Sequence, residues 1–182
     1  MHRGALLWMV SLAACASSGG TASAPASQTM RVVGPNGTQS VDLAGSVDAS
    51  SSRTMPYSVE QVWKALPGVL DSLGIPIQTM DPTTRVVGNA GFKIRGRLKN
   101  VPLSRYIDCG NSTEIGPNAD NYEVHMVFLA AVRPAEGNHS SVSLTFDAVA
   151  KPVNFAQDYS QCLSKTVLES RLFDALAQRL AS

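Results

Sequence analysis

Four basic residues at alternate positions give the clearest chemical pattern in the chain; they are Lys93, Arg95, Arg97 and Lys99. Successive side chains of a β-strand point to opposite faces, so on a strand these four would form one cationic row. Such a row favours an anionic partner, for example a lipid headgroup, a phosphorylated glycan or an acidic protein. The alternative is a solvated strand face, or a sheet edge whose charges protect it against aggregation.

Spacings that commonly serve catalysis or metal binding are missing. His2, His125 and His139 lie far apart, and no H-x-x-x-H or H-E-x-x-H spacing supports a zinc site. The chain also lacks the G-x-S-x-G, G-x-G-x-x-G and P-loop patterns of hydrolases and nucleotide-binding proteins. Its formal net charge of +1 argues against nucleic acid as a partner. We therefore expect a non-enzymatic protein that uses no metal or cofactor.

The N-terminal segment has the organisation of a secretory signal. Arg3 supplies a short cationic head, residues 5–14 form an apolar run, and small residues lead to Cys15. The apolar run is much shorter than the roughly 20 residues that a membrane-spanning helix needs. We therefore expect residues 1–14 to act as a signal peptide rather than as a transmembrane anchor.

The end of this segment, Leu12-Ala13-Ala14-Cys15, resembles the lipobox of bacterial lipoproteins. The resemblance implies cleavage before Cys15, lipidation of Cys15 and attachment to a membrane outside the cytoplasm. Ala16 follows the cysteine, which resembles the pattern sorted to the outer membrane in Gram-negative cells. The expected location is the cell envelope, with the domain in the periplasm or at the cell surface. An ordinary signal peptide that ends near a cysteine is the alternative.

Two further cysteines, Cys109 and Cys162, remain once Cys15 carries a lipid. An even remainder in an exported protein predicts a disulfide. A thiol pair for redox chemistry or metal binding is the alternative, but neither cysteine belongs to a C-x-x-C motif and neither has a histidine near it in sequence.

Residues 15–28 carry no charge and no large apolar side chain after Cys15, which predicts a flexible tether ahead of one domain at 29–182. Residues 30–33 and 39–43 flank a Pro-Asn-Gly turn and predict a β-hairpin. Alternating apolar residues over 122–132 and 142–150 predict a second, longer hairpin. The stretch 91–98 is expected to form another strand, and 110–121 a long loop.

Two amphipathic helices complete the expected elements. The first begins at Ser58, which with Gln61 forms a capping-box pattern, and ends at Gly74. Pro67 falls inside it and predicts a kink or a break. The second helix covers 168–180. Strands placed between two such helices predict an α+β fold, in which both helices pack on one face of an antiparallel sheet.

The first helix and the strands after it resemble the helix-grip domains of BamC-type envelope lipoproteins. The resemblance rests on Val62-Trp63-Lys64-Ala65-Leu66, Leu73-Gly74-Ile75-Pro76-Ile77, Asp81 and Arg85-Val86-Val87-Gly88. It implies a helix-grip-like sheet that holds a long C-terminal helix, and a role in protein contacts at the outer membrane.

These observations predict a lipid-anchored envelope protein that binds a partner through its sheet face or through the groove between sheet and C-terminal helix. The partner would be an envelope protein, a glycan or a lipid. The alternative function is transport of a small apolar ligand or lipid, because a sheet wrapped on a helix can enclose a cavity.

Overall fold

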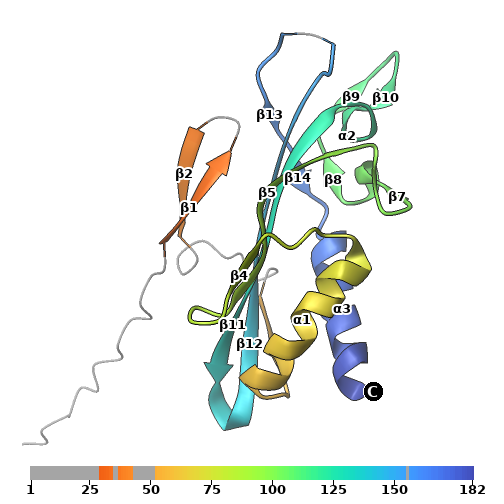
Figure 1. The fold of residues 1–182 in the computed structure, drawn as a ribbon. Helices are drawn as coiled ribbons and strands as arrows, with labels where there is room; N and C mark the ends of the chain where they lie inside the picture. The colour runs from red at the N-terminus through yellow and green to blue at the C-terminus, as the bar shows by residue number, and fades with distance from the viewer. Residues whose placement is uncertain (1–28, 35–36, 43–51, 155) are drawn as a thin grey trace, which may run out of the picture.

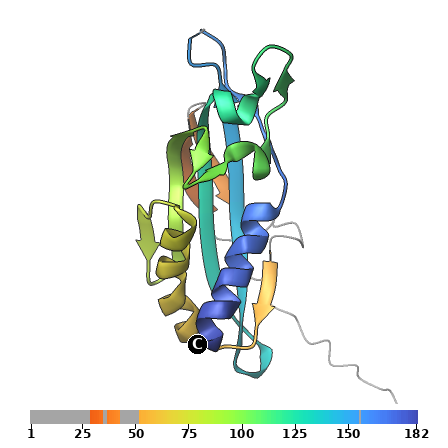
Figure 2. The same ribbon diagram turned by 90° about the vertical axis from the view of Figure 1, so that its right-hand side faces the viewer.

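A computed structural model of the chain describes residues 29–34, 37–42, 52–154 and 156–182. The predicted signal peptide at 1–14 and the whole predicted tether at 15–28, Cys15 included, lie outside the described residues. An antiparallel sheet carries helices α1 (Val59–Leu73) and α3 (Val167–Ala181) on one face, as Figures 1 and 2 show. This is the α+β architecture that the sequence predicts.

The main sheet has six antiparallel strands in the order β13-β12-β11-β5-β4, and β3 pairs with the other end of β12. Its centre is the long hairpin of β11 and β12, in which Glu123 pairs with Lys151 and Ala135 pairs with His139. The predicted long hairpin is therefore confirmed. The strands of this sheet are β3 (Ser52–Met55), β4 (Thr79–Asp81), β5 (Val86–Arg95), β11 (Glu123–Ala135), β12 (His139–Lys151) and β13 (Ser160–Gln161).

A shift in register interrupts the pairing of β5 with β11 between Met126 and Phe128. Just past it, Gly88 has φ of +144°, and a Cβ at this position would collide with the carbonyl oxygen of Phe128. Glycine is therefore required where the two strands approach each other.

Helix α1 begins and ends as its sequence predicts. The Ser58 hydroxyl accepts a hydrogen bond from the Gln61 N–H, and the Gln61 side chain accepts one from the Ser58 N–H, which completes the capping box. Gly74 ends the helix in the left-handed conformation, with φ of +81°. Pro67 does not split α1, because the helix is continuous from Val59 to Leu73. Packing of its apolar face offsets the lost hydrogen bond.

The main core lies between the helices and the inner face of the sheet, which is the face toward α1 and α3. Alternate residues of β11 point into it, and Phe128 makes an edge-to-face contact with Phe146 at 5.7 Å between ring centroids. The largest side chains of this core are less than 2% exposed; they include Leu66, Leu70, Met126, Phe128, Leu168, Leu172 and Phe173. An apolar ligand in the interior would have to displace these side chains.

Short elements cover the rest of the inner face. They are β6 (Arg97–Leu98), β7 (Val101–Pro102), a 3-10 turn η2 (Leu103–Arg105), β8 (Ile107–Asp108), β9 (Asn111–Ser112), β10 (Gly116–Pro117), α2 (Asn118–Asn121) and β14 (Leu163–Ser164). Leu98, Leu103 and Ile107 are buried in the main core. The stretch predicted as a loop at 110–121 is thus partly ordered as β9, β10 and α2. One further 3-10 turn, η3 (Glu136–Asn138), joins β11 to β12.

The predicted N-terminal hairpin is confirmed as β1 (Thr29–Gly34) and β2 (Gly37–Asp42), with Thr29 paired to Asp42. These strands form a two-stranded sheet of their own. Figures 1 and 2 show that this hairpin lies on the side of the main sheet that faces away from the helices.

Candidate functional site

The outer face of the main sheet, away from α1 and α3, combines charged and aromatic side chains at one end of the strands. Because β-strand residues alternate, β11 turns Glu123 and His125 toward this face while Val124 and Met126 enter the core. Cross-strand pairing aligns Arg95 and Lys151 on either side of Glu123. Lys93 is aligned with His125 in the next row.

We call the group formed by Lys93, Glu123, Lys151 and Tyr159 the outer-face cluster. The Lys93 ammonium lies 3.1 Å from Glu123 Oε1, and the Tyr159 hydroxyl donates a hydrogen bond of 3.1 Å to the same oxygen. The Lys151 ammonium lies 4.7 Å from the centroid of the Tyr159 ring, which is a cation–π contact. Each member therefore contacts another, so the cluster is held in one arrangement.

Ionisation of the cluster follows from these contacts. The hydrogen bond from Lys93 lowers the pKa of the Glu123 carboxyl, although burial opposes this effect. The same interaction raises the pKa of the Lys93 ammonium. Both groups therefore stay charged at neutral pH, as an ion pair.

His125 lies beside the cluster, and its surroundings favour the neutral form of its side chain rather than the charged form. Burial lowers the pKa of its imidazole, and the positive charge of Lys93 lowers it further. The neutral ring is therefore favoured at neutral pH. His125 adds a polar, uncharged surface to this end of the sheet.

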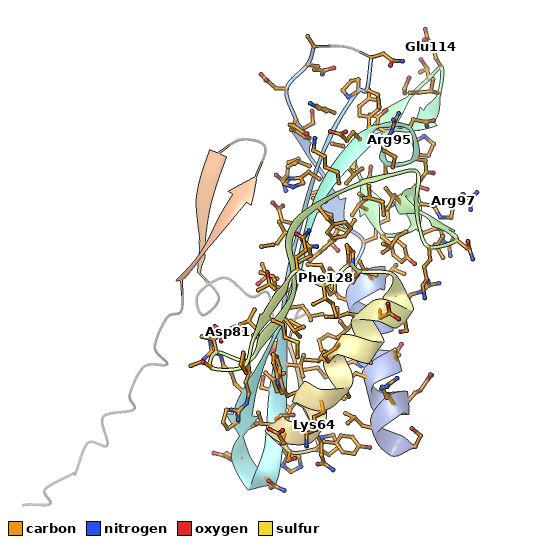
Figure 3. The ribbon with its side chains drawn as sticks, in the orientation of Figure 1. Lys64, Asp81, Arg95, Arg97, Glu114 and Phe128 are labelled. Carbon is orange, nitrogen blue, oxygen red and sulfur yellow. A yellow bond between two sulfur atoms is a disulfide. The ribbon has the colours of Figure 1, made fainter. Side chains whose placement is uncertain are left out.

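The predicted row of four basic residues is wrong beyond Arg95. Strand β5 ends there, and Gly96 takes the left-handed conformation with φ of +70°, which turns the chain into β6. Arg97 then donates a hydrogen bond of 2.9 Å to the Asn100 carbonyl. Lys99 donates one of 2.5 Å to the Ser72 carbonyl at the end of α1. Figure 3 labels Arg95 and Arg97 on either side of this turn.

Lys93 and Arg95 do share the outer face, so half of the predicted row lies at this site. Within the described ranges no ion pair or hydrogen bond engages the Arg95 side chain. Glu123 is the one acidic residue in the two rows that contain Lys93, Arg95 and Lys151. Asp147 lies further along β12 and accepts a hydrogen bond from Gln161. Within these two rows, positive charge therefore exceeds negative charge.

Sequence reasoning missed Glu123, Lys151 and Tyr159. Glu123 begins β11 and Lys151 ends β12, next to the ends of the predicted strands, so their pairing could have been found from the register of the hairpin. Tyr159 lies eight positions after Lys151, and no periodicity in the sequence between them shows that this segment returns to the sheet.

The structure places the other predicted pair, Cys109 and Cys162, at bonding distance, with 2.09 Å between sulfur atoms. Cys109 follows β8, and Cys162 lies between β13 and β14. Ser160, two residues before Cys162, pairs with β12. The disulfide therefore ties the short elements of the inner face to the edge of the main sheet.

Two further observations concern metals and membranes. Across the described residues, no group of three or more His, Cys, Asp and Glu side chains is arranged to hold a metal ion. None of the helices in that part of the chain is both long enough and apolar enough to span a bilayer.

Comparison with known sequences identifies no family for the chain. No family model matches the chain, and no curated protein is significantly similar to it.

Proposed function

We propose that this chain is a lipid-anchored, non-enzymatic protein of the cell envelope, and that its domain binds an envelope protein through the outer-face cluster. The proposed lipid anchor and envelope location rest on the lipobox-like sequence that ends at Cys15. The binding role rests on the cluster itself, which is the observation that carries the proposal.

The cluster suits protein recognition because its side chains are fixed before a partner arrives. Tyr159 is held by Glu123 on one side and by Lys151 on the other, so little side-chain entropy is lost on binding. Tyrosine and arginine are the residue types that most often dominate protein interfaces. Arg95, without a partner of its own among the described residues, lies beside them.

The excess of positive charge in these two rows favours an acidic surface on the partner. Charges of this kind at an interface speed association and make it depend on ionic strength. A partner that binds here should therefore dissociate more readily in high salt.

Photo-crosslinking in intact cells tests the binding role. A photoreactive residue at position 95 or 151 is expected to capture one discrete envelope protein, whereas the same residue at position 64 should capture none. Lys64 is a suitable control because it is exposed on α1, on the opposite face of the molecule. Tyr159→Ala should abolish capture from position 95. Equal capture from positions 64 and 95 would reject the proposal.

Metabolic labelling with a radioactive or clickable fatty acid tests the anchor separately. The wild-type chain is expected to incorporate the label and to sediment with membranes. Cys15→Ser should lose both properties, while Cys109→Ser should still be labelled. Unlabelled wild-type protein would show that the segment is an ordinary signal peptide.

A further inference from the structure

A groove opens between α1 and α3 on their solvent-exposed side, far from the outer-face cluster. Its volume is 360 Å³, and it is lined by Gly68, Val69, Ser72, Ala175, Gln178, Arg179 and Ser182. Figure 2 shows the two helices side by side in front of the sheet. A groove of this size falls at the lower end of the range that small-molecule sites occupy.

The floor of the groove is bare backbone at Gly68. A Cβ at this position would lie 2.9 Å from Arg179 Cζ and 2.9 Å from its Nη2, so the guanidinium lies directly over the glycine. Glycine is a poor residue for the middle of a helix, and here it follows Pro67, which is poorer still. A local conflict of this kind is expected where a site requires it. At Gly68 the missing side chain makes room for Arg179.

Arg179 differs from the other arginines near the helices. Arg53 pairs with Asp174 at 3.5 Å, and Arg171 donates a hydrogen bond of 2.7 Å to the Tyr106 hydroxyl. Arg179 has neither an ion pair nor a side-chain hydrogen bond to any described residue. Its guanidinium donors are therefore available to a ligand in the groove.

We infer that this groove binds a small organic carboxylate, held by the Arg179 guanidinium over Gly68. A guanidinium presents two parallel N–H donors that match the two oxygens of a carboxylate. Ala175 offers apolar contact to a short aliphatic chain, and Ser72 and Gln178 add neutral polar groups. Phosphate could also accept hydrogen bonds from the guanidinium. It would gain nothing from apolar contact with Ala175, so a carboxylate with a short aliphatic chain is favoured. This site is independent of the outer-face cluster.

Nuclear magnetic resonance titration of the full-length, non-acylated Cys15→Ser chain tests the inference. Sodium butyrate is the probe, with sodium phosphate and sodium chloride at matched ionic strength as comparisons. Butyrate should produce saturable shifts of the Gly68 amide and the Arg179 Nε–H, with a Kd on the order of 1 mM. Phosphate and chloride should produce no saturable shift. Shifts that rise linearly with butyrate, or that phosphate reproduces, would overturn the inference.

Matched variants distinguish a role in ligand binding from a role in the packing of the two helices. Arg179→Gln should abolish the butyrate shift at Gly68, whereas Arg171→Gln, on the same helix, should retain it. Gly68→Ala should also abolish the shift while the melting temperature holds or rises, since alanine is the better helix former. Saturable binding that persists in Arg179→Gln would place the ligand elsewhere. A large fall in the melting temperature of Gly68→Ala would assign the glycine to packing instead.

Discussion

The two faces of strand β11 differ in the kinds of side chain that they present. Toward the helices, Val124, Met126, Phe128, Ala130 and Val132 all enter one core. Toward the outer side, the same strand first presents Glu123 and His125, and then Val127, Leu129 and Ala131. These last three residues, together with Val86 of β5, form a small apolar cluster of their own. The inner face therefore contributes to the core along its whole length. The outer face is apolar over one half of the strand and carries charged and polar side chains over the remaining half.

This division explains why hydrophobic patterning predicts the fold better than the site. The inner residues alternate without interruption, so the pattern identifies the hairpin. The outer residues change character halfway along the strand, and periodicity carries no information about that change. The comparison can be tested by changing neighbouring residues on opposite faces.

The largest effect is expected from the inner face, with Phe128→Ala. The ring is fully buried and contacts Phe146, so its removal leaves a cavity that packed neighbours cannot fill. The free energy of unfolding should fall by about 4 kcal/mol. Urea unfolding of the Cys15→Ser chain measures the change. A fall below about 1 kcal/mol would show that the core relaxes freely around this position.

Loss of the disulfide should have the next largest effect. Beyond the helices the inner face is covered by short strands and turns, which contribute few hydrogen bonds of their own. Replacement of Cys109 and Cys162 by serine should lower the free energy of unfolding by about 3 kcal/mol, mainly because the unfolded chain gains freedom.

Hydrogen exchange locates this effect. Residues 97–121 should lose protection in the double serine variant before α1 does, because the cross-link holds those elements to the sheet edge. An equal loss of protection in α1 and in residues 97–121 would show that the disulfide acts on the whole domain.

A smaller effect is expected from Leu129→Ala, the immediate neighbour of Phe128 on the outer face. Leu129 is 1% exposed, but its apolar neighbours are Val86, Val127 and Ala131 rather than the main core. The expected loss is about 2 kcal/mol, at the lower end of the range for a buried leucine, because the apolar cluster around it is small. The same urea unfolding experiment applies. A loss as large as that of Phe128→Ala would mean that the two faces are equally well packed.

The places where sequence reasoning succeeds and fails have a physical basis. The caps of α1 at Ser58 and Gly74 are local features, readable from a few neighbouring residues. The cationic row fails because Gly96 can adopt the left-handed conformation, which strand alternation does not consider. Pro67 stays within α1 because tertiary packing outweighs its local cost. The outer-face cluster depends on the contact of Tyr159 with Glu123, which lies far away in the sequence, and local sequence patterns do not predict such a contact.

The smallest effect is expected from pH, and it is confined to the charged half of the outer face. Burial and Lys93 lower the pKa of His125 in the folded chain, so the unfolded chain binds a proton more readily. Stability should therefore fall as the pH drops below the unfolded value of about 6.5, and the loss should level off below the folded pKa.

Urea midpoints measured between about pH 8 and pH 5 test this dependence. His125→Gln should flatten the profile, because glutamine has no proton to gain. His139→Gln serves as the control, because this residue lies at the opposite end of the hairpin, away from Lys93 and Glu123. The slope that His125 contributes should remain in this variant. If His139→Gln flattens the profile and His125→Gln does not, protonation at the far end of the hairpin causes the pH dependence. Protonation of His125 beside the outer-face cluster then does not cause it.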